Sequence, residues 1–146
     1  MSSRIRPRRR IGPQGRGTTL VAEAMHPGVV TCSPHASLAV AARIMAAHRI
    51  HAVVVAEPRD SGYVVRGVVS DRDVLEALAE GDAAARTAGE VAARPLALVT
   101  PIDPLDRAIA LMRGGHTHVV VVDPVTRHPV GVVSTLDVAE LVARDA

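Results

Sequence analysis

An eight-residue phrase occurs twice in this chain, as GVVSDRDV at residues 67–74 and as GVVSTLDV at residues 131–138. The two copies differ only in the two residues between the serine and the aspartate. Internal repetition constrains a fold strongly, because each repeat has to be one structural unit that packs against its twin. The 146-residue chain is therefore expected to contain two similar units that share a core.

The residues upstream of the phrase repeat as well, and Leu38 recurs as Leu105 within a matching pattern. In each copy an extended segment leads through a proline to a helix, residues 37–48 or 105–113, whose apolar residues recur every three or four positions. A valine-rich strand, a turn, a second strand and a final helix follow. Each copy is thus predicted to be a β-α-β-β-α unit.

The predicted fold class is α+β. A unit of about sixty residues is too small to bury a sheet face alone, so we expect the two units to pack sheet to sheet. Asp103 is predicted to cap the helix at residues 105–113. The pattern places the boundaries at residues 1–18 for a leading tail, 19–80 for the first repeat and 81–146 for the second.

The serine and the aspartate of the phrase have a purely structural interpretation. Ser70 with Asp73, and Ser134 with Asp137, have the spacing of a capping box, in which the two side chains bond to backbone N–H groups at a helix start. Helix starts of this type are common. Capping alone does not explain why a glycine and two valines precede the serine in both copies of the phrase.

The leading tail contains a concentration of positive charge. All seventeen basic residues are arginine, and six of them fall in residues 1–16, where there is no acid. This tail is rich in glycine and proline and has no apolar run, so it is expected to be disordered. It could neutralise nucleic-acid phosphates, although it lacks interleaved aromatic residues; the alternative is that it only aids solubility.

The same features predict the compartment. We expect no secretory signal and no transmembrane helix, because neither the tail nor any later segment has the required apolar run. The single cysteine, Cys32, is consistent with a reducing environment. A cytoplasmic protein without membrane contact is predicted.

The sequence contains no catalytic motif of the types G-x-S-x-G, Walker loop, G-x-G-x-x-G or H-E-x-x-H. A serine and an aspartate without a fitted histidine base do not form a triad, so a non-enzyme is predicted. His116 and His118, with His51 in the other copy, raise the alternative of a metal site. No cysteine or acid lies at ligand spacing beside them, so no metal is predicted.

The order of these elements resembles the CBS domain (cystathionine β-synthase type), and the tandem arrangement resembles a Bateman module. The resemblance rests on V-x-x-x-P-x-x-x-L-x-x-A-x-x-x-M, a valine strand and G-V-V-S-x-x-D, and it covers residues 19–143. It implies two repeats related by a pseudo-twofold axis, with a cleft on either side, and a regulatory role. Many such pairs bind AMP, ADP, ATP or S-adenosylmethionine in these clefts.

The resemblance assigns Asp73 and Asp137 to the ribose hydroxyls of such a ligand and Ser70 and Ser134 to its phosphates. A carboxylate can accept two hydrogen bonds from a vicinal diol, and free N–H groups at a helix N-terminus attract anions. The alternative is a structural pair that has lost ligand binding. The remaining candidate ligand-binding residues are Thr31 and, at the mouths of the clefts, Arg49, His51, His116 and His118.

The two residues that differ between the copies predict which cleft holds a phosphate. The first copy has Arg72 where the second has Leu136. A guanidinium group can contact a phosphate through two hydrogen bonds. The first repeat is therefore predicted to hold the phosphate-bearing ligand, and the second to bind more weakly or to prefer a less charged adenosyl ligand.

The final helix of each copy predicts self-association, because the two helices carry more apolar side chains than two packed sheets need. A homodimer is therefore expected, as is common in the family that the chain resembles. The side chains concerned are Val74, Leu75, Leu78, Val138, Leu141 and Val142. A CBS pair without a catalytic domain of its own is expected to act on another protein, whose identity the sequence does not reveal.

Overall fold

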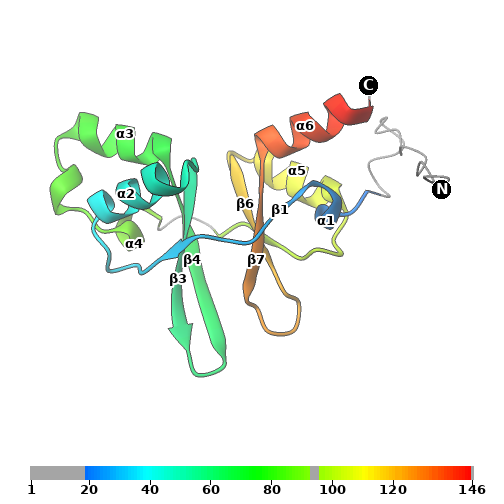
Figure 1. Cartoon of the computed structure of the whole chain (residues 1–146), viewed down its shortest axis with the longest axis horizontal. Coiled ribbons are helices and arrows are strands. Elements are labelled where there is room, and N and C mark those ends of the chain that lie inside the picture. Colours follow the sequence, from blue (N-terminus) through cyan, green and yellow to red (C-terminus); the bar gives the residue numbers. More distant parts are fainter. Residues whose placement is uncertain (1–18, 93–95, 146) are drawn as a thin grey trace, which may run out of the picture.

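The computed structural model describes residues 19–92 and 96–145, and the tail predicted to be disordered lies outside these residues. The chain forms two lobes of mixed α and β structure (Figure 1). The first lobe contains β2 (Thr31–Cys32), α2 (Leu38–His48), β3 (Ala52–Arg59), β4 (Gly62–Ser70) and α3 (Asp71–Glu80). The second contains β5 (Leu98–Val99), α5 (Leu105–Arg113), β6 (His118–Val122), β7 (Pro129–Ser134) and α6 (Thr135–Asp145).

The two lobes repeat the same element order, so the predicted α+β fold with two β-α-β-β-α repeats is confirmed. One local prediction is wrong. Pro104, not Asp103, is the N-cap residue of α5, and no side chain caps this helix. The Asp103 carboxylate instead accepts a hydrogen bond from the backbone N–H of Thr100 at 2.8 Å, which closes the preceding turn.

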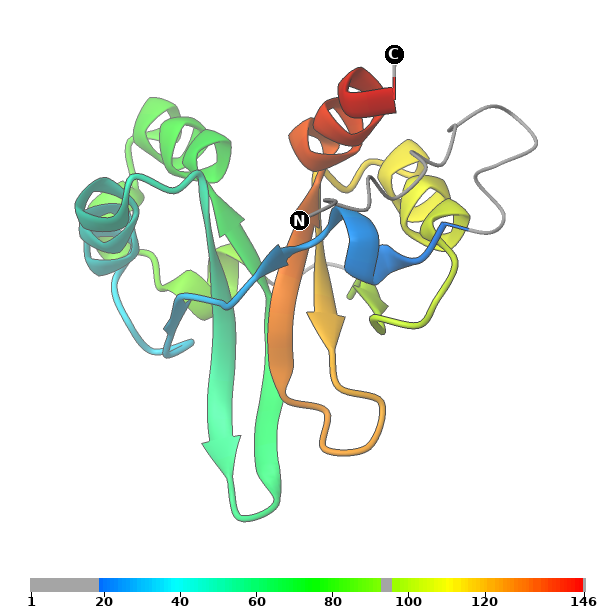
Figure 2. The same ribbon diagram turned by 45° about the vertical axis from the view of Figure 1, so that its right-hand side comes forward.

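The two sheets pack face to face (Figure 2). One sheet has the strand order β2-β3-β4, and the other has the order β1-β7-β6-β5, in which β1 is His26–Pro27. Alternation along β3 sends Val54 toward the opposite sheet and Val53 and Val55 toward the helices of its own lobe. The valine blocks of β3 (residues 53–55) and β6 (residues 119–122) are therefore buried on both faces, which explains why they contain no polar residue.

Two short helices complete the cores, and each belongs to the core of the opposite repeat. The helix α1 (Val21–Ala24) begins the first repeat in sequence, but Val21 packs with Leu105 in the core of the second lobe. The backbone N–H of Leu105 donates to the carbonyl of Thr19 at 2.7 Å, and that of Val21 donates to the carbonyl of Asp103 at 2.9 Å. The segment that leads into the first repeat thus stabilises the second.

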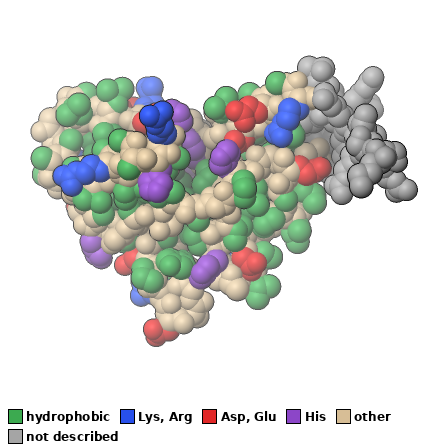
Figure 3. Space-filling model, in the orientation of Figure 1, with side chains coloured by type: hydrophobic (Ala, Val, Ile, Leu, Met, Phe, Trp, Pro, Cys, Tyr) green, Lys and Arg blue, Asp and Glu red, His purple; other side chains and the backbone are tan. Residues whose placement is uncertain are grey.

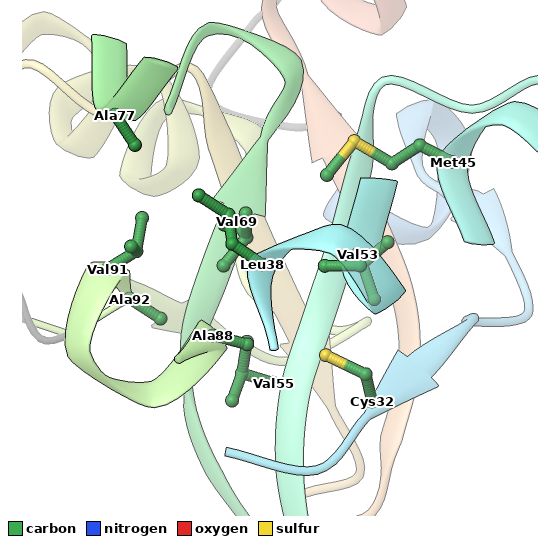
Figure 4. Packing of buried hydrophobic residues seen from close by; sticks show 11 residues of the cluster. Cys32, Leu38, Met45, Val53, Val55, Val69, Ala77, Ala88, Val91 and Ala92 are labelled. Carbon is green, nitrogen blue, oxygen red and sulfur yellow. The ribbon is translucent and has the colours of Figure 1, made fainter. Parts of the chain in front are cut away.

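The helix α4 (Ala88–Val91) makes the reciprocal contact. Ala88 and Val91 pack against Leu38 in the core of the first lobe, as Figure 4 shows. The backbone N–H of Ala88 donates to the carbonyl of Ala36 at 2.8 Å. The domain boundaries drawn from the sequence stay a prediction, but the two hydrophobic cores do not follow them. No helix within the described ranges is long and apolar enough to cross a membrane.

Each leading segment packs on the opposite lobe, and this packing explains why the repeated phrase begins with a glycine. A Cβ atom on Gly67 would overlap the backbone carbonyl oxygen of Ala92, which follows α4. A Cβ atom on Gly131 would lie 2.7 Å from the backbone carbonyl oxygen of His26 in β1. Each glycine therefore lets a leading segment approach the backbone of the opposite repeat closely.

Replacing Gly131 with alanine is expected to lower the free energy of unfolding by about 1–3 kcal/mol, because β1 has to move away from β7. Urea denaturation measures this change. Gly81→Ala is a control with no atom within 4 Å of the added methyl group. Its cost comes only from the left-handed backbone and is about 1 kcal/mol. A Gly131→Ala protein as stable as the wild type would contradict the packing argument.

Candidate functional site

A cavity of about 280 Å³ opens where the repeated phrase of the first repeat meets the second repeat, and we call it the first cleft. The first repeat contributes Ser70 and Asp73, at the junction of β4 and α3. The second repeat contributes the loop between α5 and β6, including His116, and the first residue of β6, His118. The structure thus brings four predicted ligand-binding residues from two repeats to one cavity.

The capping box predicted for the phrase is confirmed. Ser70 is the N-cap residue of α3, and its Oγ accepts a hydrogen bond from the backbone N–H of Asp73 at 3.2 Å. The Oδ2 atom of Asp73 accepts hydrogen bonds from the backbone N–H and the hydroxyl of Ser70, at 2.8 and 3.0 Å. Ser134 and Asp137 make the same three hydrogen bonds at 3.1, 2.8 and 3.0 Å.

Two histidines occupy related places at the starts of β6 and β3. Thr117 Oγ1 lies 2.9 Å from the Nδ1 atom of His118, and burial holds the pKa of His118 below its usual value. His51 precedes β3, and its Nδ1 atom lies 3.0 Å from the Oδ2 atom of Asp71. This hydrogen bond lowers the pKa of the Asp71 carboxyl group. Figure 3 shows histidine side chains on both sides of the indentation between the two lobes.

Six of the ten predicted ligand-binding residues do not line the first cleft, namely Thr31, Arg49, His51, Arg72, Ser134 and Asp137. The guanidinium group of Arg72 turns along α3 to Glu76, with 3.2 Å between Nε and Oε1. Arg49 ends α2 in the left-handed conformation, with a φ of 52°. Thr31 is exposed in β2, where it pairs with Val54 of β3. Their roles in ligand binding stay predictions.

The second copy of the phrase has different surroundings. Asp137 lines an open hollow of about 510 Å³ between α1 and α6, which also contains Glu23 and Glu140. The Nδ1 atom of His26 lies 3.7 Å from the Oδ1 atom of Asp137. His26 is itself in β1, which pairs with β7 at Gly131 and Val132. The two copies of the phrase therefore have the same capping geometry but different neighbours.

Several residues of the first cleft were missed by sequence reasoning. They are Ala92, Leu96, Ala97, Gly114 and Gly115. The glycine pair follows the end of α5, and two adjacent residues without side chains also leave space for a ligand. Ala92 was missed because α4 was not predicted, and α4 is too short to show helical periodicity.

Metal ligands do not gather in the part of the chain that the structure describes, where no group of three or more His, Cys, Asp or Glu side chains could hold a metal ion. Cys32 is buried in the core of the first lobe, and this burial raises the pKa of its thiol. A buried thiol with a raised pKa is a poor nucleophile and metal ligand, so Cys32 has the properties of a small core residue.

Solved structures of similar shape cover most of the chain. Hypoxic Response Protein I, solved with two coordinated zinc ions, is 29% identical with a TM-score of 0.68, over 84% of this chain and 98% of that one. The CBS domain pair of protein MJ0100, solved with 5′-methylthioadenosine and S-adenosyl-L-methionine, is 26% identical with a TM-score of 0.74, over 88% of this chain and 98% of that one.

A third similar structure is the CBS domain of a bacterial CNNM/CorC family Mg²⁺ transporter in complex with an inhibitor. It is 26% identical with a TM-score of 0.70, over 87% of this chain and 77% of that one. A comparison with curated proteins gives no match. The family model of the CBS domain matches two adjacent segments, residues 21–80 and 88–144. The chain therefore belongs to the CBS domain family, as a tandem pair.

Proposed function

We propose that this CBS pair is a regulatory module that binds an adenosyl ligand in the first cleft and passes the signal to a partner protein. The observation that carries the proposal is the convergence of Ser70 and Asp73 with His116 and His118 on one cavity. A carboxylate at a helix start can accept the two hydroxyls of a ribose, and the first N–H groups of the ten-residue helix α3 favour an anionic group. In this proposal His116 and His118 contact the base or the phosphate.

The likeness to the MJ0100 pair supports an adenosyl ligand, because that protein was solved with two of them. The candidates are AMP, ADP, ATP and S-adenosylmethionine. Arg72 is the proposed counter-charge for phosphate, and its guanidinium group would have to leave Glu76 to reach the ligand. Both side chains are exposed, and a surface ion pair of this type contributes only about 0.3–0.5 kcal/mol, so this movement costs little.

Thermal unfolding with a panel of AMP, ADP, ATP, NAD, S-adenosylmethionine and a cyclic dinucleotide tests the proposal. A ligand at a hundred times its dissociation constant is expected to add about 2.7 kcal/mol to the free energy of unfolding. We expect this increase for at least one adenosyl compound and not for a guanine nucleotide at the same concentration. If no adenosyl compound raises the melting temperature, the pair is structural and the proposal is wrong.

Self-association is proposed to run through the final helices of the two repeats. Leu75 and Leu78 of α3 are 62% and 68% exposed, and Val142 of α6 is also exposed. Val74, Val138 and Leu141 instead pack against the two cores, so only part of the predicted apolar surface is available to a partner. Exposed leucines on neighbouring turns of one helix are suited to contact with a second copy.

Light scattering is expected to give twice the chain mass of 15.3 kDa at micromolar concentration, with or without nucleotide. The Leu75→Glu, Leu78→Glu double variant should give the monomer mass, because two charges cannot be buried unpaired in an interface. Val125→Glu is the control, since Val125 is 87% exposed and lies in the β6–β7 turn. A wild-type monomer would refute the dimer.

A further inference from the structure

A second cavity, of about 400 Å³, lies at the hairpin end of the molecule, away from α3 and α6, and we call it the hairpin cavity. It opens between the tip of the β3–β4 hairpin and the β6–β7 turn, which Figures 1 and 2 show at the lower end of the sheets. Arg59 and Tyr63 line it from the first repeat, and Val122 and Arg127 line it from the second. The repeated phrase contributes no residue to this cavity.

The two arginines give the cavity an excess of positive charge. The Nη2 atom of Arg59 lies 3.5 Å from the Oε2 atom of Glu57. The same oxygen accepts shorter hydrogen bonds from Arg66, at 2.7 and 2.9 Å, so Glu57 neutralises Arg59 only in part. Within the described ranges Arg127 makes no ion pair. Arg59 and Arg127 thus line the cavity from the two repeats, and no carboxylate is among the described residues that line it.

The β6–β7 turn fixes the backbone of Arg127. The Oδ1 atom of Asp123 accepts hydrogen bonds from the backbone N–H groups of Val125 and Thr126, both at 2.8 Å. The backbone N–H of Arg127 donates to the carbonyl of Asp123 at 2.9 Å. The carboxylate of Asp123 is thus engaged by its own turn, and these hydrogen bonds lower its pKa.

Arg127 has a φ of 63°, a left-handed conformation in which glycine or asparagine is usual. A non-glycine residue held in such a conformation has a conformational cost, and residues of this kind concentrate at functional sites. The structure thus retains a charged side chain where a glycine would be easier to accommodate.

The floor of the hairpin cavity is apolar. Leu96, Leu98 and Val122 line it, and Tyr63 contributes the only Tyr, Phe or Trp ring of the chain. The Tyr63 ring meets the His128 ring edge to face, with 4.7 Å between the ring centres, so the two repeats touch beside the cavity. An apolar floor between two guanidinium groups is suited to a molecule with an apolar body and an anionic head.

We propose that the hairpin cavity binds a small organic anion, with its phosphate or carboxylate group between Arg59 and Arg127 and its apolar body on Leu96 and Leu98. The anion would be held by two arginines that belong to different repeats. It therefore links the two hairpins, in a cavity that shares Leu96 with the first cleft. This proposal does not depend on adenosyl binding, because no residue of the S-x-x-D motif is involved.

NMR titration of the full chain with phenyl phosphate and with benzoate tests the proposal, and benzyl alcohol serves as the uncharged probe. We expect amide shifts to change at residues 59–65 and 122–127 and to remain unchanged at Ser70, Asp73 and His116. Leu96 lines both cavities and is not used as a reporter. Binding of only one of the two anions identifies the head group that the cavity prefers and supports the proposal.

Arg59→Gln and Arg127→Asn are each expected to weaken anion binding by about tenfold or more, because each removes a charge-assisted hydrogen bond. Asparagine is chosen at Arg127 because it tolerates the left-handed backbone. Arg43→Gln, on the exposed face of α2, is the control and should bind like the wild type. Unchanged spectra are required to show that each variant folds.

Four results would overturn the proposal. Neither anion shifts the hairpin amides at millimolar concentration, or benzyl alcohol shifts them as strongly as the anions do. Alternatively, both folded arginine variants bind like the Arg43→Gln control. A shift confined to Ser70, Asp73 and His116 would likewise assign the anion to the first cleft and not to the hairpin cavity.

Discussion

Replacing Asp73 with alanine is expected to weaken binding of an adenosyl ligand to the first cleft by at least about a hundredfold. In the proposed complex the Asp73 carboxylate accepts two hydrogen bonds from the ribose, and each hydrogen bond to a charged group contributes about 1.5–3 kcal/mol. Isothermal titration calorimetry, with the ligand that gives the largest thermal shift, measures the change. The variant also loses part of a capping box, so its fold has to be verified first.

Asp137→Ala is the matched control, because Asp137 makes the same three capping hydrogen bonds at nearly the same distances. Each substitution should cost about 0.5–2 kcal/mol of stability through the lost cap. Only Asp73→Ala should lower affinity in the first cleft. If Asp137→Ala removes the tighter site and Asp73→Ala leaves it intact, the two repeats have been assigned the wrong way round.

Deleting residues 1–24 is expected to destabilise the second repeat, although the deleted residues are the leading tail and the start of the first repeat. The deletion removes Val21 and Ala24 from the core of the second lobe. It also removes the backbone hydrogen bonds that join Thr19 to Leu105 and Val21 to Asp103. Burial of one valine contributes about 1.5–3 kcal/mol and each hydrogen bond about 1 kcal/mol, so the total loss should be at least about 3 kcal/mol.

Hydrogen exchange shows which strands lose stability in the truncated chain. The amides of β6 and β7 should exchange faster in the truncated chain, while those of β3 and β4 should change less. A chain that lacks only residues 1–16 is the control, because it retains every one of these contacts. Faster exchange confined to β3 and β4 would show that the leading segment supports the repeat that it precedes.

The repeats and most of their elements could be predicted because the evidence for them is local. The helix at Leu105–Arg113 has the predicted bounds, and the valine block in each copy forms the expected strand. Periodicity and β-branched residues specify such elements within a few turns of chain. The capping boxes were also predictable, since the four residues of S-x-x-D contain the whole signal.

The packing of each leading segment into the core of the opposite repeat could not be predicted in the same way. Periodicity shows that a segment is apolar on one face but not which of two equivalent cores receives that face. The sequence of these segments contains one weak sign of their equivalence. Glu23 and Glu90 lie at equivalent positions and accept a hydrogen bond from the backbone N–H of Leu20 and Thr87 respectively. Four-residue helices are too short to stand out from turns.

The candidate site was predictable in part. Ser70, Asp73, His116 and His118 line one cavity, because the face-to-face packing of the two sheets places the end of β4 near the start of β6. The proposed orientation of Arg72 depends on a competing partner that the motif does not include. Glu76 lies one helical turn further along α3, and the two side chains pair at that spacing.

The position of α1 beside α6 determines where the chain can be attached to anything else. Both helices line the same hollow on the second lobe, so the described chain enters and leaves from that lobe (Figure 1). A surface tether at either end would hold the second lobe and leave the first lobe and the hairpin end free. Fluorescent labels at the two ends of the described chain would both lie on the second lobe. Labels that measure the distance between the two lobes therefore belong at one of these ends and in α2 or α3.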